Sequence, residues 1–195
     1  MFVTLYGINN IGKSTQALML VEHFKKLGLK VKYLKFPIYD LSPSGVFLHT
    51  VLRSKVQTIT EAELQMWFAL NRYQFENHLK DFIQNHDLII TEDYTGTALA
   101  WGTAKGESLE WLEQINLKLL KEDLAILIDG ERSTDSIEKG HIHENANDLI
   151  NRTKNILLDL ADKKNWHIIQ RQEKIQDTNN LLIELITQKL ENFRR

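Results

Sequence analysis

Short runs of strand length recur along this chain, separated by segments with helical periodicity. The apolar or alternating runs lie at residues 2–6, 29–36, 87–91, 123–129 and 166–170. The run at 87–91 is nearly all apolar, as expected of a parallel strand buried on both faces. Strands that alternate with helices are typical of a parallel sheet with helices on both faces. The pattern therefore predicts an α/β protein with five parallel strands.

The intervening segments carry apolar residues at spacings of three and four, the period of a helix. After the first strand, one helical face is predicted from Ala17, Leu18, Val21, Phe24 and Leu27, with Gly28 as the C-terminal cap. Thr60 and Glu63 predict a capping box for a long helix that runs to about residue 85. The other helices are expected at 44–53, 96–105, 108–120 and 149–161 and at the C-terminus.

The link between the first strand and the first helix has the spacing of a phosphate-binding loop. Gly7 is followed by four residues and then by Gly12-Lys13-Ser14. The glycines let the backbone turn so that amide groups and the helix N-terminus point at an anion. Lys13 adds a positive charge, and the Ser14 hydroxyl suits Mg²⁺ bound to the last two phosphates. The expected ATP-binding residues are Gly7, Asn9, Asn10, Ile11, Gly12, Lys13, Ser14 and Thr15.

Length and composition narrow the remaining choices. With 195 residues the chain suits a single domain spanning 1–195, which would bury about 70% of its unfolded surface. The absence of cysteine excludes disulfides, thiolate catalysis and cysteine-ligated zinc. A net charge of −2 with interspersed signs argues against a general nucleic-acid or acidic-membrane binder. There is no basic leader, and no apolar run approaches the ~18 residues of a membrane span, so we expect a soluble, cytoplasmic protein.

Further chemistry is expected where the strands end. Glu92, Asp93 and Asp129 follow predicted strands and could order Mg²⁺ or its waters, although acids also end strands simply as solvated turn residues. Phe68 and Arg72 are four residues apart on the long helix and share a face. One could stack on a base and the other could hold a phosphate. The spacing alone favours a core position for Phe68.

The polar segment after Asp129 offers two alternatives to weigh. His141 and His143, with Glu144 beside them, suggest a metal site, but the two histidines have no third ligand in register and fall short of a zinc site. Arg132 and Lys139 could belong to a mobile cationic loop over a phosphate site.

A switch GTPase is the rival class for the same loop. Residues 93–96 spell D-x-x-G after a buried strand. The guanine-reading N-K-x-D is missing after the next strand, where the chain continues as Gly130-Glu131-Arg132. The GTPase alternative is therefore disfavoured.

Five stretches, in the correct order, carry a family resemblance. They are GINNIGKSTQ at 7–16, KFP at 35–37, FALNR at 68–72, EDYTGTALAW at 92–101 and NRT at 151–153. Over nearly its whole length the chain resembles the thymidylate kinase family of P-loop nucleoside monophosphate kinases. The resemblance implies a three-layer P-loop nucleoside-kinase fold, with a five-stranded parallel sheet, helices on both faces and a short lid at about 130–144.

The resemblance also implies residue roles. Phe68 would stack on thymine, Arg72 would bind the acceptor phosphate, and Trp101 would crowd the 2′ position of the sugar. The implied acceptor-binding residues are Phe36, Pro37, Phe68, Arg72, Thr97 and Trp101.

The chain departs from the family pattern at several positions. Asn9 stands where the loop usually has an acid, and Glu92-Asp93 replaces an Asp-Arg pair. Ile38 and Tyr39 stand where an arginine is often found, and His141 takes the place of a lid arginine. Phosphate-binding charge has thus been lost.

The interpretation is a kinase that moves the γ-phosphoryl group of MgATP to dTMP and gives dTDP and ADP. Its catalytic residues would be Lys13, Glu92, Arg132 and Arg152, with Ser14 and Glu92 as the Mg²⁺ ligands. The expected partners are ATP and a nucleoside monophosphate, with no nucleic acid and no membrane, and a homodimer is left open. The alternatives are a kinase for another (deoxy)nucleotide and a non-catalytic nucleotide-binding protein of the same fold that acts through a protein partner.

Overall fold

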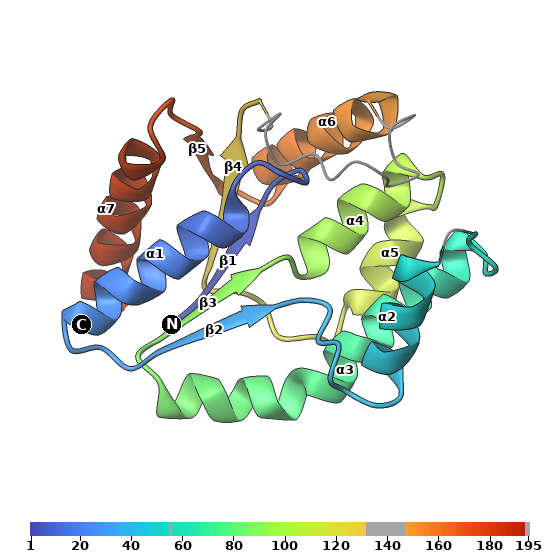
Figure 1. Cartoon of the computed structure of the whole chain (residues 1–195), viewed down its shortest axis with the longest axis horizontal. Helices are drawn as coiled ribbons and strands as arrows, with labels where there is room; N and C mark the ends of the chain where they lie inside the picture. Colours follow the sequence, from blue (N-terminus) through green and yellow to red (C-terminus); the bar gives the residue numbers. More distant parts are fainter. Residues whose placement is uncertain (55, 132–146, 194–195) are drawn as a thin grey trace.

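Five parallel strands form one sheet in the computed structural model of this chain, which describes residues 1–54, 56–131 and 147–193 (Figure 1). The strand order is β2-β3-β1-β4-β5. The strands are β1 (Phe2–Tyr6), β2 (Val31–Lys35), β3 (Leu88–Glu92), β4 (Leu124–Asp129) and β5 (His167–Gln170). All five predicted strands are therefore confirmed, and every one pairs in parallel with its neighbours.

The helices form two groups around this sheet. On one face α1 and α7 pack together, while α4 packs against both α5 and α6 on the other. The helices are α1 (Lys13–Lys26), α2 (Ser44–Arg53), α3 (Glu61–Asn85), α4 (Thr95–Ala104), α5 (Leu109–Asn116), α6 (Asn147–Lys163) and α7 (Ile175–Phe193). This is the three-layer arrangement that the alternation of strands and helices predicted. In the described part of the chain, no helix has the length and apolar character needed to cross a membrane.

Burial across the sheet follows strand position. The central strands β1 and β3 are buried at every residue, whereas the edge strand β5 alternates between half-buried and exposed residues. Helices on both faces remove the central strands from water, so these strands carry apolar residues on both sides. The buried apolar residues form one cluster centred on them.

The predicted inward face of α1 is wrong in part. Leu18 and Leu27 are 55% and 62% exposed, whereas the polar Gln16 is buried. Gln16 faces α7, where the Asn179 side chain donates a hydrogen bond of 2.9 Å to its Oε1 atom. The face that α1 buries is therefore set by its partner helix, which its own periodicity does not show.

The helix caps predicted at Gly28 and Thr60 are present, whereas one predicted helix is too long. Gly28 has φ 83°, the left-handed conformation expected just after a helix. The Thr60 hydroxyl accepts a hydrogen bond from the Glu63 amide, as an N-cap should. The helix predicted at 108–120 is too long, because α5 ends at Asn116.

Candidate active site

The phosphate-binding loop runs from the end of β1 to the start of α1, and its glycines are required by geometry. Gly7 has φ 150°, and a Cβ there would lie 2.8 Å from the Ile128 carbonyl oxygen at the end of β4. Gly12 has φ 105°, and Asn10 has φ 63°, a conformation that asparagine tolerates better than most residues. Asn9 and Asn10 are exposed at the tip of the loop, and Ile11 anchors the loop in the core.

The side chain of Lys13 folds back over this loop and is only 7% exposed. Its ammonium donates hydrogen bonds to the carbonyl oxygens of Gly7 (2.8 Å) and Ile8 (3.1 Å). It also lies 3.6 Å from the Asp93 Oδ1 atom. The charge of Lys13 is thus held at the loop by oxygen atoms of the protein.

Ser14 and Glu92 meet across the gap between α1 and β3. The Ser14 hydroxyl donates a hydrogen bond of 2.6 Å to Glu92 Oε2, and Glu92 is 1% exposed. The Lys35 ammonium, at the end of β2, lies 3.1 Å from Ser14 Oγ and 3.4 Å from Glu92 Oε2. Ser14 Oγ and Glu92 Oε2 thus both lie beside the Lys35 ammonium. A hydroxyl and a carboxylate, two oxygen ligands that suit Mg²⁺, are therefore next to each other.

The other oxygen of the Glu92 carboxylate has Tyr33 as its hydrogen-bond partner. The Tyr33 phenol donates a hydrogen bond to Glu92 Oε1. Burial, followed by the nearby Glu92 carboxylate, raises the pKa of the Tyr33 phenol. The phenol therefore keeps its proton at neutral pH and remains a donor to the carboxylate.

Asp93, the next residue, points elsewhere. The Thr97 hydroxyl donates a hydrogen bond of 2.8 Å to Asp93 Oδ1, the atom that faces Lys13. Adjacent residues past the end of a strand point in different directions, so the two acids have different partners. Glu92 contacts the candidate metal ligand Ser14, and Asp93 contacts the candidate phosphate ligand Lys13.

Arg72 on α3 is a buried cation, 4% exposed. Its Nε atom donates a hydrogen bond of 3.0 Å to Asn116 Oδ1, whereas its Nη2 atom has no partner in the described part of the chain. No carboxylate of that part forms an ion pair with it. Burial lowers the pKa of the guanidinium to about 10, partly offset by nearby phenols. A buried guanidinium with an unused donor is suited to an anionic ligand.

The apolar residues predicted for the acceptor site differ in their surroundings. Phe36 is buried, with its ring 5.0 Å from that of Tyr94 and 5.8 Å from that of Phe75. Pro37 is half-buried. Phe68 is also half-buried and lies outside the core cluster, so the core position that its spacing favoured is wrong. Trp101 on α4 is half-buried against the core.

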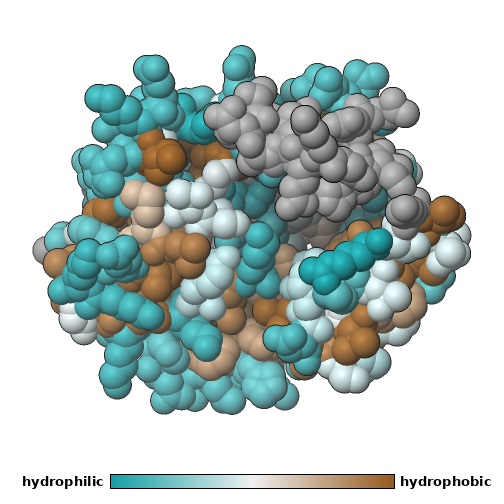
Figure 2. All heavy atoms as spheres, viewed as in Figure 1, coloured by the Kyte–Doolittle hydropathy of each residue, from teal (hydrophilic) through white to brown (hydrophobic). Residues whose placement is uncertain are grey.

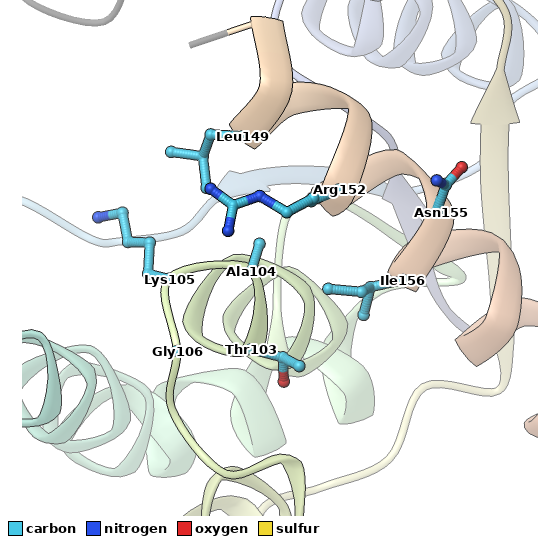
Figure 3. Close-up of a pocket in the computed structure, with 8 residues that line it drawn as sticks. All are labelled: Thr103, Ala104, Lys105, Gly106, Leu149, Arg152, Asn155 and Ile156. Atoms are coloured by element: carbon cyan, nitrogen blue, oxygen red, sulfur yellow. The ribbon is translucent and has the colours of Figure 1, made fainter. Parts of the chain in front are cut away.

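Two other predicted site residues are Asp129, at the end of β4, and Arg152, on α6. Partial burial raises the pKa of Asp129, but hydrogen bonds from Lys154 and Gln170 outweigh this effect and hold the pKa below its ordinary value. Arg152 is exposed on α6 and, with Lys105, borders a cavity of about 520 Å³ between α6 and the end of α4 (Figure 3). Residues 132–144 of the predicted lid lie outside the described residues, and with them Arg132, Lys139, His141, His143 and Glu144.

The family model described as thymidylate kinase matches residues 5–182 of this chain. The chain belongs to the thymidylate kinase family. The probable thymidylate kinase of Thermococcus onnurineus is 28% identical over 203 residues, which cover 97% of this chain and 98% of that protein. A protein of Invertebrate iridescent virus 6 that carries the thymidylate kinase name is 26% identical over 141 residues, 72% of this chain and 65% of that protein.

A solved structure of the thymidylate kinase from Candida albicans superposes on this chain with a TM-score of 0.80. It is 22% identical, and the match covers 97% of this chain and 92% of that one. This likeness confirms the P-loop nucleoside-kinase fold. Family membership confirms the resemblance drawn from the five motifs and the assignment to the kinases.

Sequence reasoning missed Tyr33 and Lys35, which contact the Glu92 carboxylate from β2. Lys35 pairs in register with Glu92 across the parallel ladder, and Tyr33 lies two residues earlier on the same face of the strand. The signal was present in the alternation of β2 and in the acid at the end of the neighbouring strand. Using that signal requires knowing that β2 pairs with β3, and the sequence alone does not show this pairing.

Proposed function

We propose that this thymidylate kinase family member is active as a kinase that transfers the γ-phosphoryl group of ATP to dTMP. An oxygen of the dTMP phosphate forms the new bond to the γ-phosphorus, the bond from that phosphorus to the bridging oxygen breaks, and ADP leaves with the electron pair. The observation that carries the proposal is the buried Arg72 guanidinium with an unused donor. The acceptor phosphate is already ionised, so no strong base is required.

Lys13 and the loop amides would hold the phosphates of ATP. The Lys13 ammonium needs to exchange only two carbonyl oxygens and a carboxylate for phosphate oxygens. Its positive charge then lies against the transferring group, where negative charge spreads in the transition state.

Ser14 and Glu92 would hold the Mg²⁺ that accompanies ATP. Their oxygens are joined by a 2.6 Å hydrogen bond beside the Lys35 ammonium, so the two candidate ligands already lie close together. When bound, the metal neutralises charge on the phosphates. The chain's own contribution is to fix the carboxylate, which is buried and bonded at both oxygens.

Arg72 would bind the acceptor phosphate, and Phe68 would stack on the base. Both lie on α3 at a spacing of four residues, so one helix positions phosphate and base together. Trp101 would crowd the 2′ position and favour a deoxynucleotide.

A kinase for another (deoxy)nucleotide and a non-catalytic nucleotide binder remain the alternatives. Asp93 is the reason to keep both alternatives. Its carboxylate lies 3.6 Å from Lys13, at a position where the family resemblance leads us to expect an arginine. That carboxylate opposes phosphate binding electrostatically.

ADP release with MgATP, measured against a panel of nucleoside and deoxynucleoside monophosphates, tests the proposal. We expect dTMP to give the highest kcat/KM, and dUMP to exceed UMP. A different best acceptor would move the chain to the first alternative. Tight ATP binding without turnover on any acceptor would establish the second.

We also propose that the chain forms a homodimer through α3 and α2. Met66, Leu70 and Tyr73 are 51%, 40% and 37% exposed at spacings of four and three, which makes one apolar stripe on α3. Hydrophobic side chains also gather on the surface over α2 (Figure 2). Light scattering should give the dimer mass for the native chain and the monomer mass for Leu70→Glu. A monomeric native chain at tens of micromolar would contradict this.

A further inference from the structure

The end of β2 presents two polar side chains to one buried carboxylate. Tyr33 and Lys35 are two residues apart on the same face of the strand, and both reach Glu92 on β3. Tyr33 contacts Oε1, whereas Lys35 lies beside Oε2, the atom that also accepts from Ser14. The carboxylate therefore has a neutral donor on one oxygen and a half-exposed cation beside the other.

We propose that Tyr33 and Lys35 tune metal binding at Glu92 in opposite directions, Tyr33 as a positioning residue and Lys35 as an internal competitor for the metal. The inference rests on the proposed function, because it assigns the Ser14–Glu92 pair to Mg²⁺.

The competing role of Lys35 follows from where its ammonium lies. It is 3.1 Å from Ser14 Oγ and 3.4 Å from Glu92 Oε2, the two oxygens proposed to hold the metal. Two cations cannot share that place, so Lys35 has to leave when a metal binds. Its side chain is 53% exposed and can move into water.

The positioning role of Tyr33 follows from the burial of Glu92 and from the partners of its two carboxylate oxygens. Glu92 is 1% exposed, so its orientation depends on the groups that surround it inside the protein. Tyr33 is the partner of Oε1, the oxygen that Ser14 and Lys35 do not contact. Hydrogen bonds to a ligating carboxylate fix its orientation, and their loss typically lowers metal affinity about 10- to 100-fold.

The experiment measures how strongly Mg²⁺ and ADP couple in each variant. A fluorescent ADP analogue is titrated into the protein with excess Mg²⁺ and again with EDTA, and the ratio of the two Kd values is compared. The affinity of the free nucleotide for Mg²⁺ is common to all variants, so changes in the ratio report the protein site.

We expect opposite changes from the two β2 variants. Lys35→Met should raise the coupling about fivefold, the size of one charge–charge interaction at this separation in water. Tyr33→Phe should lower it about tenfold. Lys35→Arg, which restores the cation, should return the coupling to the native value. Lys30→Met removes the same charge just before β2 begins and should match the native chain.

Each outcome decides the proposal. An unchanged or lower coupling in Lys35→Met would show that Lys35 supports the carboxylate or ignores it, and would overturn its role as a competitor. An unchanged coupling in Tyr33→Phe, with a native melting temperature, would overturn the positioning role. If the native chain fails to bind ADP under both conditions, the proposed function fails instead, and this inference fails with it.

Discussion

The two buried cations of the site are satisfied in opposite ways. Lys13, on the proposed donor side, has two carbonyl oxygens and a carboxylate of the protein around its ammonium. Arg72, on the proposed acceptor side, has one amide oxygen as a partner and leaves Nη2 unbonded within the described part of the chain. Both are at least nine-tenths buried.

This difference bears on how each half of the site is prepared for its ligand. An unpaired polar group in the interior costs about 1–3 kcal/mol, and more when it is charged. The fold therefore carries a cost at Arg72 that an anionic ligand would relieve, whereas at Lys13 a ligand replaces partners that are already present. We therefore expect the acceptor to stabilise the folded protein more than ATP does. We expect the donor residues to contribute more to the rate of the chemical step.

The largest effect is expected at Lys13. Lys13→Ala should lower kcat about a thousandfold, because its charge acts on the transferring phosphoryl group. The melting temperature should stay within a few degrees, since the loop keeps its glycine geometry. Lys26→Ala on the same helix is the matched control, because that side chain is 73% exposed and, among the described residues, forms an ion pair only with Glu22. A near-native rate for Lys13→Ala would remove it from the donor site.

Arg72→Met should act on the acceptor instead. We expect kcat/KM for dTMP to fall about a hundredfold, because a phosphate loses a charged fork of donors, while the KM for ATP changes little. The free energy of unfolding should change by less than about 1 kcal/mol, since losing the bond to Asn116 is offset by removing an unpaired buried charge. Steady-state kinetics and denaturant unfolding measure both. A strongly destabilised variant would show that Arg72 is structural.

A variant at Phe68 tests base recognition independently of phosphate recognition in the proposed acceptor half. Phe68→Ala should raise the KM for dTMP by the value of one base–aromatic stack, about 1–3 kcal/mol or roughly 5- to 150-fold. ATP kinetics should be unaffected, because Phe68 lies on α3 and the donor loop lies between β1 and α1. An equal rise in both KM values would point to general damage rather than a lost stack.

The turn of the phosphate-binding loop could be predicted from the sequence, and the proposed acceptor half only in outline. The residues from Gly7 to Ser14 are contiguous, so their spacing alone specifies the turn. The Ser14–Glu92 contact could also be predicted, because the carboxyl ends of parallel strands meet at one edge. The family resemblance, rather than periodicity, supplied the acceptor residues.

What the sequence did not reveal depends on which elements are neighbours. Tyr33 and Lys35 alternate as in any edge strand, and their contact with Glu92 appears only once β2 is paired with β3. The face of α1 was misassigned at Leu18 and Leu27 because α7 packs beside it and provides Asn179 as a partner for Gln16. Periodicity shows that a helix has a buried side, and the tertiary contacts decide which residues occupy it.

The smallest expected effect concerns Asp93, the acid that gives Lys13 its third partner. Asp93→Asn keeps a side-chain oxygen for the bond from Thr97 and suits φ 56°, because asparagine tolerates the left-handed region. Removing the carboxylate 3.6 Å from Lys13 should lower the KM for ATP a few-fold at unchanged kcat, since less negative charge faces the phosphates.

Asp93→Arg sharpens the same test. Arginine costs about 1 kcal/mol in that backbone region, yet a cation in place of the carboxylate should lower the KM of the substrate whose phosphate it faces several-fold. Comparing the KM values for ATP and dTMP shows which substrate that is. Glu92→Gln is the companion variant, and it should reduce kcat strongly and change the Mg²⁺ dependence. If Asp93→Asn abolishes activity while Glu92→Gln is tolerated, then the metal-associated carboxylate is Asp93. Lys13 would in that case be held by the same acid that holds the metal, and the contrast between the self-satisfied Lys13 and the unpaired Arg72 would no longer separate donor from acceptor.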